Sequence, residues 1–110
     1  MNNSYSLSIL LFNANGLKNH VNEFQTVLSD KRIDIALISE THFTKYSHIS
    51  IPGYYLLKSN HPDGTSHGGA AILIKTNLKF HPLTNFSQSH FQSCAISITI
   101  NNIPIVIVAV

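Results

Sequence analysis

Two short apolar runs, separated by an amphipathic segment, restrict how the first part of this chain can fold. Leu7–Asn13 and Ile33–Ser39 each have the length and composition of a buried strand. From Asn19 to Lys31, apolar residues recur at spacings of three and four, which predicts a helix with Asn19 as its N-cap. A strand, a helix and a strand in this order predict a right-handed crossover with both strands parallel in one sheet.

Polar residues stand at the carboxyl ends of both predicted strands. Asn13 closes the first strand, and Glu40 follows directly after the second. Because parallel strands end at the same edge of a sheet, and ligands of open α/β sheets bind at that edge, we expect a site there. On position alone, the Glu40 carboxylate either caps the following turn or binds a cation.

The second half of the chain predicts further strands separated by turns. A Pro52–Gly53 turn precedes a short strand, and residues 60–69 form a polar loop. The pair Asn101–Asn102 predicts a tight hairpin. Apolar runs predict three more strands, at Ala70–Lys75, Cys94–Ile100 and Ile103–Val110. Because the chain ends inside its most hydrophobic run, we interpret residues 1–110 as part of a larger domain.

Composition narrows the class of protein without naming a partner. A hydrophobic share of 44% over 110 residues excludes a disordered chain and fits one globular domain. The net charge of +2 permits a polyanionic partner but does not identify one. The single cysteine, Cys94, predicts a buried thiol in a reducing compartment. No leader or membrane span is recognised at the start, which favours a nuclear or cytoplasmic location.

Three common site motifs are not present in the sequence. Gly64 and Gly69 have the separation of a phosphate loop, but Ala70 and Ala71 replace its Lys and its Ser or Thr. The Gly-x-Ser-x-Gly elbow of hydrolases is absent from the sequence. The seven histidines are scattered without an HExxH helix or a cysteine pair, which argues against structural zinc: His20, His42, His48, His61, His67, His81 and His90.

Four segments, in their order along the chain, carry a resemblance to a known family. They are LLFNANGL, LISETHF, IPGYYLL and HGGAAILIK. In this order they resemble the endonuclease domain of non-LTR retrotransposons, particularly the jockey-like elements, within the endonuclease/exonuclease/phosphatase superfamily. The resemblance implies a two-sheet α/β sandwich of the deoxyribonuclease-I-like type, with residues 1–110 as the amino-terminal half of that domain.

The resemblance also implies roles for residues at the predicted sheet edge. Glu40 matches the acidic ligand of the catalytic divalent metal, usually Mg²⁺. Asn13 matches the strand-end asparagine that helps to position that acidic ligand and the scissile phosphate. Asn15 falls where some relatives carry an aspartate, and no catalytic role transfers to His42. These residue types suit the chemistry, because Mg²⁺ prefers hard oxygen ligands and retains several waters.

The function implied by this resemblance is nicking of target DNA, dependent on Mg²⁺, for insertion of a retroelement. The family's remaining catalytic groups are a tyrosine, an Asp and Asn pair and a final Asp and His pair, which we expect beyond Val110. The isolated chain is therefore expected to be inactive, and whether it is an enzyme stays open. Two alternatives also remain: an inactive, degenerate remnant, or a superfamily phosphodiesterase or phosphatase with another substrate. DNA is the expected partner, a membrane is not, and the oligomeric state stays open.

Overall fold

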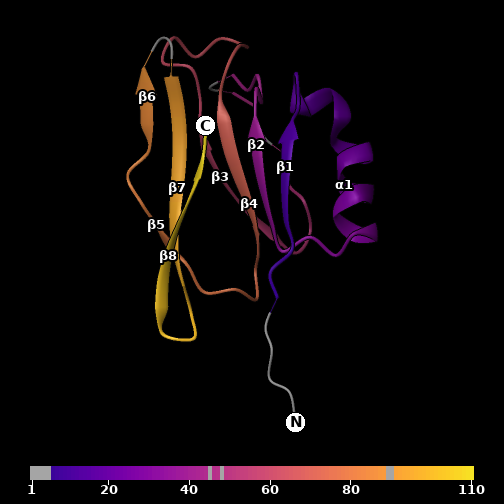
Figure 1. Cartoon of the computed structure of the whole chain (residues 1–110). Coiled ribbons are helices and arrows are strands. Elements are labelled where there is room, and N and C mark those ends of the chain that lie inside the picture. The colour runs from indigo at the N-terminus through magenta and orange to yellow at the C-terminus, as the bar shows by residue number, and fades with distance from the viewer. Residues whose placement is uncertain (1–5, 45, 48, 89–90) are drawn as a thin grey trace.

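Two β-sheets pack face to face, and one helix covers the outer face of the first sheet (Figure 1). The computed structural model describes residues 6–44, 46–47, 49–88 and 91–110. The first sheet has the strand order β1-β2-β4-β3. Its strands are β1 (Ile9–Asn13), β2 (Ile35–Ser39), β3 (Tyr54–Ser59) and β4 (Ala70–Lys75).

The second sheet is built around one long strand. β7 (Phe91–Ile100) pairs antiparallel with β8 (Ile103–Ala109) along the whole length of β8. The shorter strands β5 (His81–Pro82) and β6 (Phe86–Gln88) also pair with β7, and both are antiparallel to it. The predicted two-sheet α/β sandwich is therefore confirmed.

The predicted order of strand, helix and strand at the start of the chain, with both strands parallel in one sheet, is also confirmed. β1 and β2 are parallel, with Ile9 opposite Ile35 and Asn13 opposite Ser39. The connection contains a 3₁₀ turn, η1 (Leu17–His20), and the helix α1 (Val21–Asp30). The prediction of Asn19 as the N-cap is wrong. Asn19 lies inside the 3₁₀ turn, so the α-helix begins two residues later, after His20.

Side chains along β2 alternate between its two faces, and this alternation explains the three layers of the fold, which are the helix, the first sheet and the second sheet. Ala36 and Ile38 face the helix, where they belong to a buried cluster with Phe24 and Leu28 of α1. Ile35, one position out of phase, belongs to the other buried cluster, which lies between the two sheets. Because both faces of β2 are covered, its apolar run is nearly continuous rather than alternating.

The hairpin between β7 and β8 follows the predicted turn chemistry. Asn101 and Asn102 have φ angles of 51° and 66°, and Ile100 is opposite Ile103 across the turn. Asparagine tolerates this left-handed region better than most residues, and a two-residue loop with both φ angles positive matches the twist of the flanking strands.

The apolar outer face of β8, at the end of the chain, is largely uncovered. Ile107 and Ala109 are buried against the first sheet, whereas Val106, Val108 and Val110 are 61%, 46% and 58% exposed. In the part of the chain that the structure describes, no helix combines the length and apolar character needed to cross a membrane.

Cys94 is a buried thiol between the two sheets, which confirms the prediction of its burial. Burial raises its pKa from 9.0 to about 12. Below pH 9.0 the thiol is protonated in both the folded and the unfolded chain. Between pH 9.0 and about 12 only the unfolded chain loses the proton, so the free energy of unfolding should fall as the pH rises.

We therefore expect alkaline destabilisation that depends on this one side chain. Urea unfolding at pH 8 and pH 10.5 should show a larger drop in midpoint for the wild type than for Cys94→Ala. A drop of equal size in both proteins would assign the effect to other groups, with the Tyr54 hydroxyl, whose pKa burial also raises, as the first alternative.

Candidate functional site at the edge of the first sheet

The carboxyl ends of β1 and β2 lie at one edge of the first sheet. Asn13, the last residue of β1, is opposite Ser39, the last residue of β2, and Glu40 follows directly. Neighbouring strands are separated by about 4.8 Å, which brings the Asn13 and Glu40 backbones within reach of a shared ligand. Both residues are exposed. The structure therefore places the backbones of the two residues at one edge of the sheet, open to solvent.

The backbone after Glu40 is held from both sides. On the β1 side, the Gly16 amide donates to Glu40 O at 2.9 Å, and the Leu17 amide donates to Thr41 O at 3.0 Å. On the β4 side, the His42 amide donates to Gly68 O at 2.9 Å. Glu40 and His42 have φ angles of 51° and 55°. Left-handed residues other than glycine are costly and persist where the surroundings fix them, often at functional sites.

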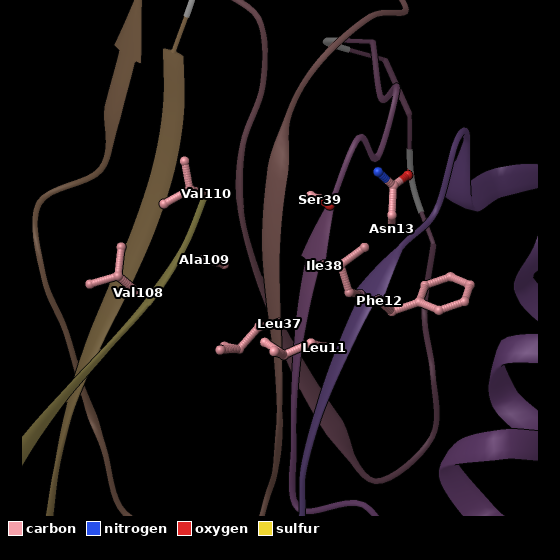
Figure 2. Close-up of a pocket in the computed structure, with 9 residues that line it drawn as sticks. All are labelled: Leu11, Phe12, Asn13, Leu37, Ile38, Ser39, Val108, Ala109 and Val110. Atoms are coloured by element: carbon pink, nitrogen blue, oxygen red, sulfur yellow. The ribbon is translucent and has the colours of Figure 1, made fainter.

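Asn13 stands at the polar end of a groove of about 400 Å³ between the two sheets (Figure 2). Its carboxamide lies above Leu11 and Leu37, while Val108 and Val110 line the opposite side. Asn13 Oδ1 accepts a hydrogen bond from the Asn15 amide at 3.2 Å, which orients the carboxamide. An amide oxygen has two lone pairs, so Oδ1 keeps one for a further partner.

The donor atoms at this edge fit a hard divalent cation. Within the described residues, the Glu40 carboxylate makes no hydrogen bond or ion pair, so both of its oxygens are available. A carboxylate and an amide oxygen are ligands that Mg²⁺ accepts, with waters in the remaining positions. Asn15 lies beside this edge and lines a polar hollow of about 290 Å³ with Lys18 and His42. Its metal role stays a prediction.

Gly69 of the HGGAAILIK segment has a structural role beside this edge. Gly69 has a φ angle of 93°, and its amide donates to Gln92 Oε1 at 2.8 Å, linking the first sheet to β7. A Cβ at position 69 would lie 2.4 Å from Thr41 Oγ1. Thr41 is fully buried next to Glu40. Glycine at position 69 therefore lets the two segments approach closely enough to fix the edge.

Gly69→Ala is expected to lower the free energy of unfolding by about 2 to 4 kcal/mol, from a left-handed backbone cost and from overpacking against Thr41. The matched control is Gly53→Ala. Gly53 has a φ angle of 85°, but nothing lies within 4 Å of its added Cβ. The control should therefore lose only about 1 to 2 kcal/mol. Equal losses in urea unfolding would contradict the close contact with Thr41.

Sequence reasoning missed one group of side chains in the polar loop. His61, Asp63 and His67 each place one potential metal-ligand atom within 4.8 Å of the others. The interpretation of all seven histidines as scattered is therefore wrong for His61 and His67, because the turns of the loop bring them together. The spacing His-x-Asp-x₃-His in a turn-rich segment was the available signal. His48 and His90 lie outside the described residues.

Comparison of the sequence with known families gives one match over nearly the whole chain. Residues 10–110 match the endonuclease/exonuclease/phosphatase family. The RNA-directed DNA polymerase from the mobile element jockey of Drosophila melanogaster is 41% identical over 87 residues, 79% of this chain. The probable RNA-directed DNA polymerase from transposon X-element, also of D. melanogaster, is 36% identical over 87 residues, 78% of this chain. The chain spans 10% of the length of each polymerase.

Solved structures share the fold at low sequence identity. An AP endonuclease from Leishmania major superposes with a TM-score of 0.75 at 11% identity, over 93% of this chain and 39% of its own. A 3′ phosphatase from Neisseria, bound to a product DNA hairpin, gives a TM-score of 0.62 at 18% identity, over 92% of this chain and 40% of its own. The sandwich, the shared segments and the family match agree: the chain belongs to the endonuclease/exonuclease/phosphatase family, and it is similar to a segment of the polymerases of the jockey and X-element mobile elements.

Proposed function

We propose that Asn13 and Glu40 hold Mg²⁺ against a DNA phosphate, and that the domain to which this chain contributes nicks target DNA for insertion of a retroelement. The observation that carries the proposal is the parallel register of β1 and β2, which puts both residues at one edge. The similarity of this chain to the polymerases of jockey and X-element also supports the proposal.

Each of the two side chains has a distinct part in this proposal. Glu40 supplies a negatively charged oxygen to the cation, and nucleases of this family generally use divalent metal ions. Asn13 orients a phosphate through its neutral amide without adding negative charge. A bound Mg²⁺ would stabilise charge on the phosphate and on the leaving oxygen. The backbone bonds around Glu40 fix the main chain from which its carboxylate would reach the cation.

The polar hollow beside this edge supports contact with nucleic-acid phosphate. Lys18, His42 and Ser66 are among its lining residues, so it offers one cation and several hydrogen-bonding groups. Phosphate contacts of this kind position a protein on DNA without reading its sequence. We infer that DNA passes over the edge with its backbone toward this hollow.

The proposal is tested in a chimaera, because the curated relatives are much longer than this chain. Residues 10–110 replace the corresponding segment of the jockey polymerase, and supercoiled plasmid is incubated with Mg²⁺ or with EDTA. We expect nicking that requires Mg²⁺, leaves an extendable 3′ hydroxyl and weakens in Asn13→Ala. A chimaera that folds and does not nick would support an inactive remnant, and cleavage of other phosphate esters alone would support a different substrate.

A further inference from the structure

The loop between β3 and β4 gathers two imidazoles around one carboxylate. His61 Nδ1 lies 2.9 Å from Asp63 Oδ1, and His67 Nε2 lies 3.4 Å from Asp63 Oδ2. The two imidazole rings are in contact, with their centroids 3.8 Å apart. These residues are not among those that form the Asn13 and Glu40 edge, so the cluster is a separate group of potential ligands.

The separations between these atoms fit coordination of a small transition-metal ion. In a tetrahedral zinc site with metal–ligand distances of about 2.0 to 2.2 Å, neighbouring ligand atoms lie about 3.3 Å apart. The two nitrogen–oxygen separations in the loop are 2.9 and 3.4 Å. The full set of three atoms lies within 4.8 Å. The two separations join different oxygens of Asp63, so the loop would have to close around an ion to place one oxygen and two nitrogens at three corners of a tetrahedron, with water at the fourth.

Thr65 orients two of the three ligands. Its hydroxyl donates to Asp63 Oδ1 at 2.7 Å, and its amide donates to the same oxygen at 2.8 Å. The hydroxyl has only one proton to give, so its contact of 2.9 Å with His67 Nδ1 requires the imidazole to be the donor. The proton on Nδ1 leaves the lone pair of a neutral ring on Nε2, which faces Asp63 Oδ2. A metal ion held by both His67 Nε2 and Asp63 Oδ2 would bridge this separation of 3.4 Å.

We propose that His61, Asp63 and His67 form a binding site for a divalent transition-metal ion, with Zn²⁺ as the first choice. Imidazole nitrogen favours zinc and its neighbours over Mg²⁺, whereas the edge at Glu40 offers oxygen donors alone. The two sites therefore select different metals. The new site stands on the loop geometry and does not depend on the proposed nuclease function.

The position of the loop gives the ion a consequence for the neighbouring edge. Ser39 and Ser59 both pair with Ala70, so the loop emerges at the same end of the sheet as Glu40. Ser66 Oγ donates to His42 O at 2.9 Å, which ties the loop to the segment after Glu40. An ion bound in the loop would restrain its turns and, through this contact, the backbone beside the oxygen-donor site.

The test uses the full 110-residue chain, freed of metal with a chelator and titrated with CoCl₂ and then ZnCl₂. We expect Co²⁺ to give the visible absorption of a tetrahedral site, and Zn²⁺ to displace it at one ion per chain. His67→Ala and Asp63→Asn should each weaken Zn²⁺ binding by at least about 10-fold, and Thr65→Val should weaken it by about 10-fold through loss of orientation. His67 and Asp63 are about half exposed, so these variants should fold.

Two matched controls separate this site from general histidine binding and from the nuclease proposal. His81→Ala removes an exposed histidine on β5, and Glu40→Gln removes the carboxylate at the sheet edge. Both should bind Zn²⁺ like the wild type. The proposal is overturned if the wild type gives no tetrahedral Co²⁺ spectrum, if His67→Ala binds equally well, or if His81→Ala loses as much affinity as His67→Ala.

Discussion

In the chimaera that carries residues 10–110, Glu40→Gln is expected to lower the rate of Mg²⁺-dependent plasmid nicking by about 10²- to 10³-fold, the range for loss of one group that stabilises transition-state charge. Glutamine keeps the size of the side chain and removes its negative charge. Because Glu40 is exposed and makes no ion pair with a described residue, the change should leave stability unaffected. Nicking rates at saturating Mg²⁺ and thermal unfolding of both proteins measure the two effects.

The matched control for Glu40→Gln is Asp30→Asn. Asp30 is an exposed acid at the last position of α1, and α1 runs back from the end of β1 toward the start of β2. It therefore lies toward the opposite end of the sheet from Glu40. We expect nicking by Asp30→Asn within about twofold of the unmodified chimaera, because surface changes away from a site have small effects. Nicking that survives Glu40→Gln would remove the proposed role of this carboxylate.

Phe24→Ala is expected to lower the free energy of unfolding of the chain by about 3 to 5 kcal/mol, the usual cost of truncating a buried phenylalanine. Phe24 is 1% exposed in the helix-side core, and its ring centroid lies 4.9 Å from that of Phe12 on β1. Removing the ring would leave a cavity under the crossover that aligns β1 with β2. Urea unfolding followed by far-UV circular dichroism measures the loss.

Val27→Ala on the same helix gives the comparison for Phe24→Ala. Val27 is 39% exposed, so its truncation should cost no more than about 1 kcal/mol. Small domains have a free energy of unfolding of about 5 to 15 kcal/mol. The loss at Phe24 would therefore be a large part of the free energy of unfolding of this chain. A loss below that of Val27→Ala would mean that the helix does not pack on the sheet through Phe24.

The strand, helix and strand at the start of the chain could be predicted because hydrophobic periodicity and the crossover rule agree there. The apolar run Ile33–Ser39 predicts a buried strand, and in the structure β2 is covered on both faces. The turn at Asn101–Asn102 was predictable for a local reason, its tolerance of positive φ. In these segments the local preferences and the packed fold favour the same conformation.

The elements that sequence reasoning missed depend on contacts distant in the chain. β5 consists of His81 and Pro82, which carry no strand pattern, and it forms because β7 offers Ser97 and Ile96 as partners. β6 pairs Phe86–Gln88 with the extension of β7 back to Phe91, before the start predicted for that strand. Short edge strands of this kind are set by the neighbouring strand, so their own residues do not reveal them.

The position of the sheet edge was predictable. The backbone conformation at this edge and the path of the loop beside it were not. Parallel pairing places Asn13 near Glu40 from topology alone. The left-handed conformations of Glu40 and His42 arise from amide contacts on both sides, which involve Gly16 and Gly68. The cluster of His61 and His67 depends on how the loop turns. That path is fixed by hydrogen bonds through Asp63 and Thr65 rather than by periodicity.

The metal site at Asn13 and Glu40 is tested most directly in the chain itself by NMR titration with Mn²⁺ in place of Mg²⁺. A His67→Ala background removes binding to the loop. We predict paramagnetic broadening of the amide signals of Asn13, Ala14, Glu40 and Thr41 at substoichiometric Mn²⁺, and its loss when Glu40→Gln is added. Broadening that is absent from these amides, or that persists unchanged without the carboxylate, would contradict a cation held between the ends of β1 and β2.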